Sequence, residues 1–112
     1  MTDVLAEIDN PYVCACLDVA HATLYSQVPL TAWVEQLSPW LYSCHLNNHD
    51  GRLDLHWSLD KGVINYSQVL ALFRQLTRPP LLTLEMSKPE QISASLPLLR
   101  LPGMNHHAPP NI

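Results

Sequence analysis

An acidic side chain and an imidazole end an apolar run near the N-terminus. Residues 13–22, VCACLDVAHA, begin as an apolar stretch and then place Asp18 and, three positions later, His21. Both groups are costly to bury without a partner. One interpretation is a turn or a helix cap after a strand. The other is part of a metal site, because carboxylates and imidazoles bind Zn²⁺, Mn²⁺, Mg²⁺ and Fe²⁺.

Two more residues of this kind follow apolar runs further along the chain. His45 lies near the end of LYSCHL, residues 41–46, and Glu85 directly follows LLTL, residues 81–84. Taken singly, each has an ordinary explanation, as a hydrogen-bonded structural histidine or a solvated or paired glutamate. Their repetition at the same place in three successive segments favours a common metal site.

The elements around these residues alternate between strand and helix. The pattern predicts strands at 13–17, 41–46 and 81–84, and helices at 30–37, 66–76 and from a capping box at 87–90 to about residue 99. Strands separated by helices form parallel sheets, and such strands are buried on both faces. Ligands bind at their carboxyl ends. Neighbouring strands lie about 4.8 Å apart, so Asp18, His45 and Glu85 can converge on one ion.

A polar stretch, NNHDGRLDLHWSLDKG at 47–62, is too long for an ordinary connection. Loops of this length in compact domains are usually functional or disordered. Asp54 and His56 point the same way if the chain is locally extended. They could bind a second ion, or Asp54 could orient His56. Asp50-Gly51 is expected to form a turn, and His49 is expected to be solvated.

The bulk composition weighs against several classes of protein. The chain has 112 residues and a net charge of −4, with no basic block, which makes nucleic-acid binding a poor match. No apolar run approaches the roughly 20 residues of a membrane span, and the acidic N-terminus is unlike a signal peptide. We therefore expect a cytoplasmic protein whose three cysteines (Cys14, Cys16 and Cys44) are reduced, buried core thiols rather than zinc ligands.

Three segments together resemble the C-terminal part of the xylose isomerase-like (β/α)₈ barrels. This group contains sugar isomerases, epimerases and the endonuclease IV type of AP endonucleases. CLDVAHA resembles its sixth-strand motif C-x-D-x-x-H-A, HLNNHDGRLDLHWSLDKGVINY its seventh-strand segment, and LLTLEM its last strand. The resemblance implies an α/β fold of three consecutive parallel βα units, equivalent to the C-terminal part of a TIM barrel. These units are expected over residues 1–101, with a loose Pro-rich tail at 102–112.

The resemblance also implies roles for individual residues around a divalent cation (Zn, Mn or Mg). Those expected to bind metal are Asp18, His45, Glu85, Asp54 and His56. Glu85 and His21 are the implied catalytic residues, Glu85 through proton transfer. His21 and Asn47 are implied to contact the substrate, a small sugar or polyol, and His21 is alternatively a ligand of a second metal.

The sequence departs from the family pattern in three places. Asn48 stands where the H-L-x-D motif has an acid, and Asp60-Lys61 replaces the first glycine of a G-x-G turn. The five preceding βα units of the barrel have no counterpart in these 112 residues.

Three functions therefore remain open at this stage. The first is an isomerase or epimerase that transfers a proton through a metal-stabilised enediolate. The second is a zinc phosphodiesterase acting on abasic DNA, against which the acidic charge weighs. The third is a non-catalytic remnant, or a partial barrel that assembles with itself or a companion chain.

Overall fold

The structure, a computed structural model of the chain, describes residues 2–100. Its elements in chain order are α1 (Thr2–Ile8), β1 (Ala15–Asp18), α2 (Val19–Tyr25), α3 (Leu30–Leu37), β2 (Leu41–Leu46), α4 (Tyr66–Arg74), β3 (Leu81–Leu84) and α5 (Pro89–Leu99). The predicted tail at 102–112 lies outside the described residues.

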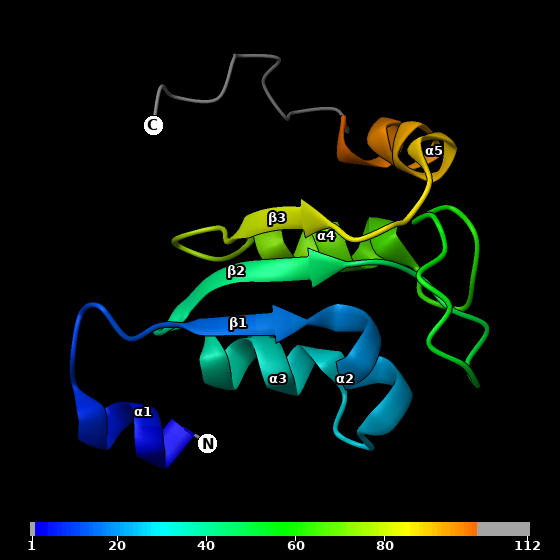
Figure 1. Cartoon of the computed structure of the whole chain (residues 1–112). Coiled ribbons are helices and arrows are strands. Elements are labelled where there is room, and N and C mark those ends of the chain that lie inside the picture. Colours follow the sequence, from blue (N-terminus) through cyan, green and yellow to red (C-terminus); the bar gives the residue numbers. More distant parts are fainter. Residues whose placement is uncertain (1, 101–112) are drawn as a thin grey trace.

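The three strands form one parallel sheet in the order β1-β2-β3, and all point the same way (Figure 1). Asp18 is aligned with His45 across the first pair, and His45 with Thr83 across the second. Glu85 follows β3 directly, and its backbone N–H donates to the Leu46 carbonyl at 3.0 Å. The predicted α/β class with three parallel βα units is confirmed. The carboxyl ends of the three strands lie together at one end of the sheet.

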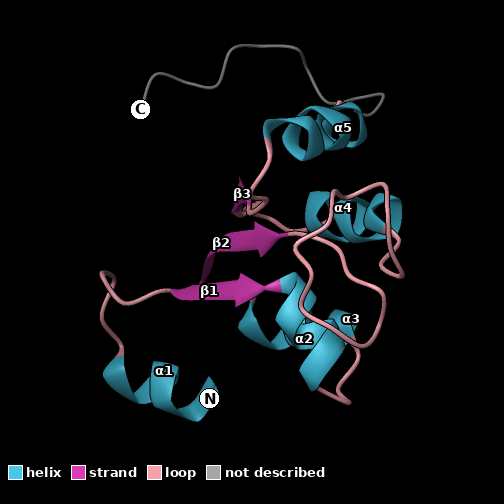
Figure 2. Cartoon of the chain, turned by 45° about the vertical axis from the view of Figure 1, so that its right-hand side comes forward, coloured by secondary structure: helices cyan, strands magenta, loops and turns pink. Residues whose placement is uncertain are grey.

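The sheet is covered on one face only. Leu17, Cys44 and Leu46 point into the core, and α2, α3 and α4 lie on that side of the sheet (Figure 2). On the other face Cys16 and Thr83 are exposed. The expectation of burial on both faces was therefore wrong for residues 2–100. Burial of the second face needs a second packed layer or a closed barrel, and this part of the chain supplies one layer.

Two short helices were not expected from the sequence. One is α1, and the other is α2, which starts directly after β1 because the Asp18 carboxylate caps it by accepting the His21 backbone N–H at 2.9 Å. The capping box at 87–90 does not form. Lys88 is the N-cap of α5 without a side-chain bond, and Pro89 in the first turn begins the helix with its fixed φ instead.

The three cysteines are free thiols, but only Cys44 is buried. Cys14 precedes β1, and Cys16 lies on the uncovered face of the sheet, so both are exposed. The prediction of buried core thiols was right for Cys44 alone.

Within the described residues, none of the helices is long and apolar enough to cross a membrane.

Candidate metal centre

The first cluster consists of Asp18, His45 and Glu85, the three residues predicted to converge. One ligand atom from each lies within 4.8 Å of the others. His45 Nδ1 contacts Glu85 Oε1 directly, and both side chains are about one-third exposed. Two carboxylates and one imidazole are a ligand set that suits Zn²⁺ or Mn²⁺. The parallel register thus delivers the geometry that the sequence pattern anticipated.

Asp18 also connects this cluster to His21, one helical turn further on. Its second oxygen, Oδ2, lies 3.3 Å from His21 Nδ1. Because the carboxylate can only accept, the ring nitrogen facing it carries the proton. Asp18 therefore caps α2 and orients the His21 ring, which explains why an acid and an imidazole end this strand together.

The second cluster consists of His21, Asp54 and His56. Asp54 lies between the two rings: its Oδ2 is 2.8 Å from His21 Nε2, and its Oδ1 is 3.3 Å from His56 Nε2. One ligand atom from each residue again lies within 4.8 Å of the others. The loop before α4 therefore brings Asp54 and His56 to a histidine 33 residues or more away in the chain.

The hydrogen bonds of His56 determine which of its ring nitrogens can bind a cation. Its Nδ1 lies 3.0 Å from the backbone carbonyl of Glu85, which only accepts, so Nδ1 carries the proton. Nε2, which lies 3.3 Å from Asp54 Oδ1, is then the ring nitrogen left to bind a cation, as in metal-binding histidines held by a carbonyl. His56 has a φ of 52°, an uncommon backbone conformation outside glycine. Strain of this kind is often found at functional sites.

The second cluster is electrostatically coupled. The hydrogen bond with Asp54 raises the pKa of His21 above its usual value of 6.5. Partial burial of the ring acts in the opposite direction, and the negative charges of the nearby acids add to the rise. The same bond lowers the pKa of the Asp54 carboxyl below 3.8. Each group of the pair thus favours the charged form of the other.

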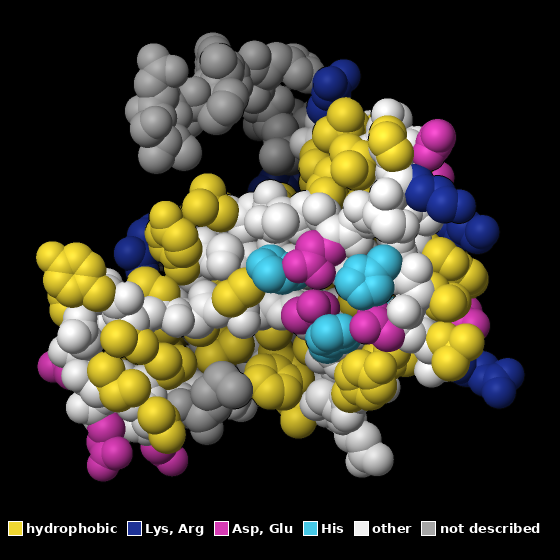
Figure 3. Space-filling model, in the orientation of Figure 1, with side chains coloured by type: hydrophobic (Ala, Val, Ile, Leu, Met, Phe, Trp, Pro, Cys, Tyr) yellow, Lys and Arg dark blue, Asp and Glu magenta, His cyan; other side chains and the backbone are white. Residues whose placement is uncertain are grey.

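The two clusters form one patch at the carboxyl ends of the strands. Figure 3 shows acidic and histidine side chains gathered there, while the Lys and Arg side chains visible in this view lie toward the periphery. Such a distribution favours a cation over a phosphate backbone.

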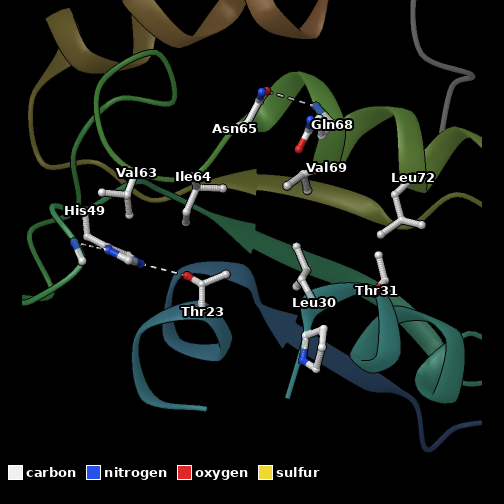
Figure 4. Close-up of a pocket in the computed structure, with 12 residues that line it drawn as sticks. Thr23, Leu30, Thr31, His49, Val63, Ile64, Asn65, Gln68, Val69 and Leu72 are labelled. Carbon is white, nitrogen blue, oxygen red and sulfur yellow. Dashed lines mark hydrogen bonds between the residues drawn. The ribbon is translucent and has the colours of Figure 1, made fainter. Parts of the chain in front are cut away.

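Several other polar residues of the loop are buried, Asn47 and His49 among them. Asn47, implied to contact substrate, is 0% exposed, and its side-chain amide has no hydrogen-bond partner among residues 2–100. The expectation that His49 is solvated was wrong, because its ring is packed under the loop at 1% exposure. Its Nε2 pairs with Thr23 Oγ1 at 2.8 Å and its Nδ1 accepts the Gly51 N–H at 2.9 Å (Figure 4).

The predicted turn at Asp50-Gly51 is confirmed. Gly51 has a φ of 89°, and Asp50 Oδ1 accepts the backbone N–H groups of Arg52 and Leu53, both at 2.9 Å.

A cavity of about 400 Å³ opens between α3 and α4 on the helix side of the sheet (Figure 4). His49 and Thr23 lie at one end of it, and its other walls are mainly apolar. It shares no residue with either cluster.

Comparison with solved structures identifies a similar fold. A crystal structure described as a D-tagatose 3-epimerase-like protein matches with a TM-score of 0.73 at 21% sequence identity. The match covers 88% of this chain and 39% of that chain, so these residues correspond to a minor part of the longer protein. No protein-family model and no curated protein sequence matches the chain.

Proposed function

We propose that these residues form the C-terminal part of a divalent-metal-dependent isomerase or epimerase acting on a sugar or related polyol. The observation that carries the proposal is the convergence of Asp18, His45 and Glu85 at the ends of three consecutive parallel strands. The similar fold of the epimerase-like protein supports it. Because the match covers 39% of that chain, the complete active unit would need further βα units, in the same polypeptide or a companion.

The first cluster would hold the cation, which supplies a positive charge that stabilises developing negative charge on neighbouring substrate oxygens. Glu85 would accept or return the proton at the adjacent carbon, since one of its oxygens can face substrate. His21 Nε2 would hold a substrate hydroxyl where the second cluster carries no cation. In this proposal the His45 contact keeps the Glu85 carboxylate oriented.

Solvent exchange tests this proton transfer. The complete active unit, with its further βα units or companion chain and supplied with Mn²⁺ or Mg²⁺, is incubated with a panel of ketoses in D₂O, and deuterium at the carbon beside the carbonyl is measured. We expect sugar-dependent incorporation that Glu85→Gln abolishes and that Glu90→Gln, an exposed change on α5, preserves. Incorporation at the same rate in Glu85→Gln would contradict the role of Glu85.

The second cluster would hold a second cation. His21, Asp54 and His56 supply two imidazoles and one carboxylate, and Asp18 links them to the first cluster at 3.3 Å. This ligand set suits Zn²⁺.

Two adjacent cations favour a second candidate function, phosphodiester hydrolysis at abasic DNA. Paired ions can stabilise both the attacking and the leaving oxygen of a displacement. The net charge of −4 and the acidic patch weigh against it. The test is nicking of an abasic duplex, which the zinc hydrolase would perform and a zinc chelator would abolish. If the same preparation, with the further βα units present, neither nicks this duplex nor exchanges protons in sugars, these residues form a non-catalytic remnant.

A further inference from the structure

We propose that Asn48 is the positioning residue that holds Asp54 and His56 in place, and that this position requires an amide rather than a carboxylate. The inference deepens the proposed function, since it rests on the second cation assigned there. The loop between β2 and α4 has no helix or strand of its own across Asp54 and His56. Contacts with other parts of the chain must therefore hold Asp54 and His56 beside His21.

The Asn48 side chain uses its full hydrogen-bonding capacity inside this loop. It is 0% exposed. Its Nδ2 donates to the backbone carbonyls of Leu59 and Ile64, both at 3.0 Å. Its Oδ1 accepts the backbone N–H of His49 at 2.9 Å and that of Ile64 at 3.0 Å. An amide has two donor hydrogens and two acceptor lone pairs, and all four are engaged.

The Asn48 backbone fastens the same loop at the residue next to His56. Its N–H donates to the Trp57 carbonyl and its carbonyl accepts the Trp57 N–H, both at 2.9 Å, in an isolated antiparallel bridge. Because Trp57 directly follows His56, the bridge fixes the point from which the His56 ring reaches the cluster. The hydrogen bonds of Asn48 thus join the chain before Asp54 to the chain after His56.

Gly62 packs directly on this amide. A Cβ at Gly62 would lie 2.4 Å from Asn48 Oδ1 and 2.5 Å from the His49 carbonyl, and its φ is 140°. The departures from the family turn fall at Asp60 and Lys61, which are exposed. The glycine that the turn retains is therefore the one in contact with Asn48.

A carboxylate could not replace the Asn48 amide. It accepts hydrogen bonds but donates none, so the Leu59 and Ile64 carbonyls would each face a buried negative oxygen. An amide in place of the acid of the H-L-x-D pattern therefore suits the hydrogen bonds of this loop.

The test compares two identical chemical changes in one loop. Asn48→Asp removes two donated bonds. Asn65→Asp preserves the one side-chain bond that Asn65 makes within residues 2–100, in which Oδ1 accepts the Gln68 N–H at the start of α4. Aspartate is as good an N-cap as asparagine. Zn²⁺ binding to each protein is measured by calorimetry, with Co²⁺ absorption to report each site.

We expect two ions in the unaltered protein and in Asn65→Asp. Asn48→Asp should keep the ion at Asp18, His45 and Glu85, and bind the second at least about tenfold more weakly, the size of effect seen when partners of metal ligands are removed. A variant that is merely less stable would not lose one site selectively. Equal second-site affinity in Asn48→Asp, or equal weakening in Asn65→Asp, would overturn the inference.

Amide hydrogen exchange of the metal-free, unaltered protein gives an independent test, which also serves if Asn48→Asp fails to fold. The Trp57 and Ile64 N–H groups, bonded to Asn48, should exchange at least about tenfold more slowly than those of Arg52 and Leu53, bonded to exposed Asp50. Equal exchange would overturn the inference about Asn48. An unaltered protein that binds fewer than two ions would instead contradict the second cation of the proposed function.

Discussion

Each histidine at the strand ends is held by an oxygen that fixes its ring. Asp18 faces His21 Nδ1, the Glu85 carbonyl faces His56 Nδ1, and the Glu85 carboxylate contacts His45. For His21 and His56, these partners leave Nε2 directed at Asp54. The ligand types were readable from the sequence. Their pairing was not, because it depends on which ring nitrogen each backbone path presents.

The raised pKa of His21 predicts how cation binding at the second cluster depends on pH. Below that pKa a proton occupies Nε2 and competes with the cation, so affinity should rise with pH by about tenfold per unit and level off above it. The levelling should come above pH 6.5, because Asp54 stabilises the protonated ring. Calorimetry over a pH series measures this, and binding that is flat between pH 5.5 and 7.5 would contradict it.

Without a cation the same pair should stabilise the fold over a limited pH range. The Asp54 contribution is present above its usual pKa of 3.8 and is lost as pH falls through its lowered folded-state value. The His21 contribution is present below 6.5 and is lost as pH rises through its raised value. Asp54→Asn should therefore cost at most about 1 kcal/mol near pH 5 and less above the His21 pKa, since both side chains are partly exposed. Urea unfolding near pH 5 and above the His21 pKa measures both losses of stability, and the larger loss should be at the lower pH.

At the scale of elements, β2 and β3 match the prediction residue for residue because short apolar runs bounded by turn residues define them. The α2 helix escaped prediction because no loop separates it from β1; Asp18 ends the strand and caps the helix at once. The loop from 47 to 65 could be recognised as functional by its length. Its path could not, because it depends on the bonds of one buried amide.

The two glycines of this loop should respond differently to alanine. Gly62→Ala places a methyl group 2.4 Å from Asn48 Oδ1 at a φ of 140°, and should lower the free energy of unfolding by about 2 to 3 kcal/mol. Among residues 2–100, a methyl group at Gly51 meets only Val63, at 3.7 Å, so Gly51→Ala should cost about 1 kcal/mol for its positive φ. Denaturant unfolding of both variants measures the difference, and equal losses would contradict the close packing of Gly62 on Asn48.

The three thiols should differ in reactivity according to the element that carries each. Burial raises the pKa of Cys44 to about 12, so little of it is the reactive thiolate at neutral pH. Cys14 and Cys16 are exposed. Alkylation of the folded protein followed by mass spectrometry should modify these two and spare Cys44, whereas all three react in denaturant. Modification of Cys44 at a comparable rate would contradict the packing of β2.

At the scale of the whole molecule, residues 2–100 leave part of the sheet unpaired and uncovered. Within them, the outer edges of β1 and β3 pair with no other strand, and one face of the sheet is open. Unpaired edges promote association with further strands. The sequence predicted this incompleteness through its resemblance to three units of a longer barrel, and the partial match to the epimerase-like structure agrees with it.

We expect the protein to associate through these edges as its concentration rises. Leu81, the 48% exposed first residue of β3, should contribute, and Leu81→Lys should weaken association because charge on an edge strand opposes pairing. Val4→Lys, at a 56% exposed position on α1, is the matched control and should have no effect. Sedimentation velocity over a concentration series decides. A monomer throughout, or equal effects of both variants, would contradict this use of the edge.

The central claim is that the ends of three parallel strands bind a divalent cation, and the most direct measurement is the metal content of the folded protein. Elemental analysis after uptake of Zn²⁺ or Mn²⁺ and removal of excess should give at least one ion per chain. Asp18→Ala and Glu85→Ala should lose it, while Asp3→Ala, an acid on α1, should retain it. Well-folded protein that takes up neither ion would contradict the account.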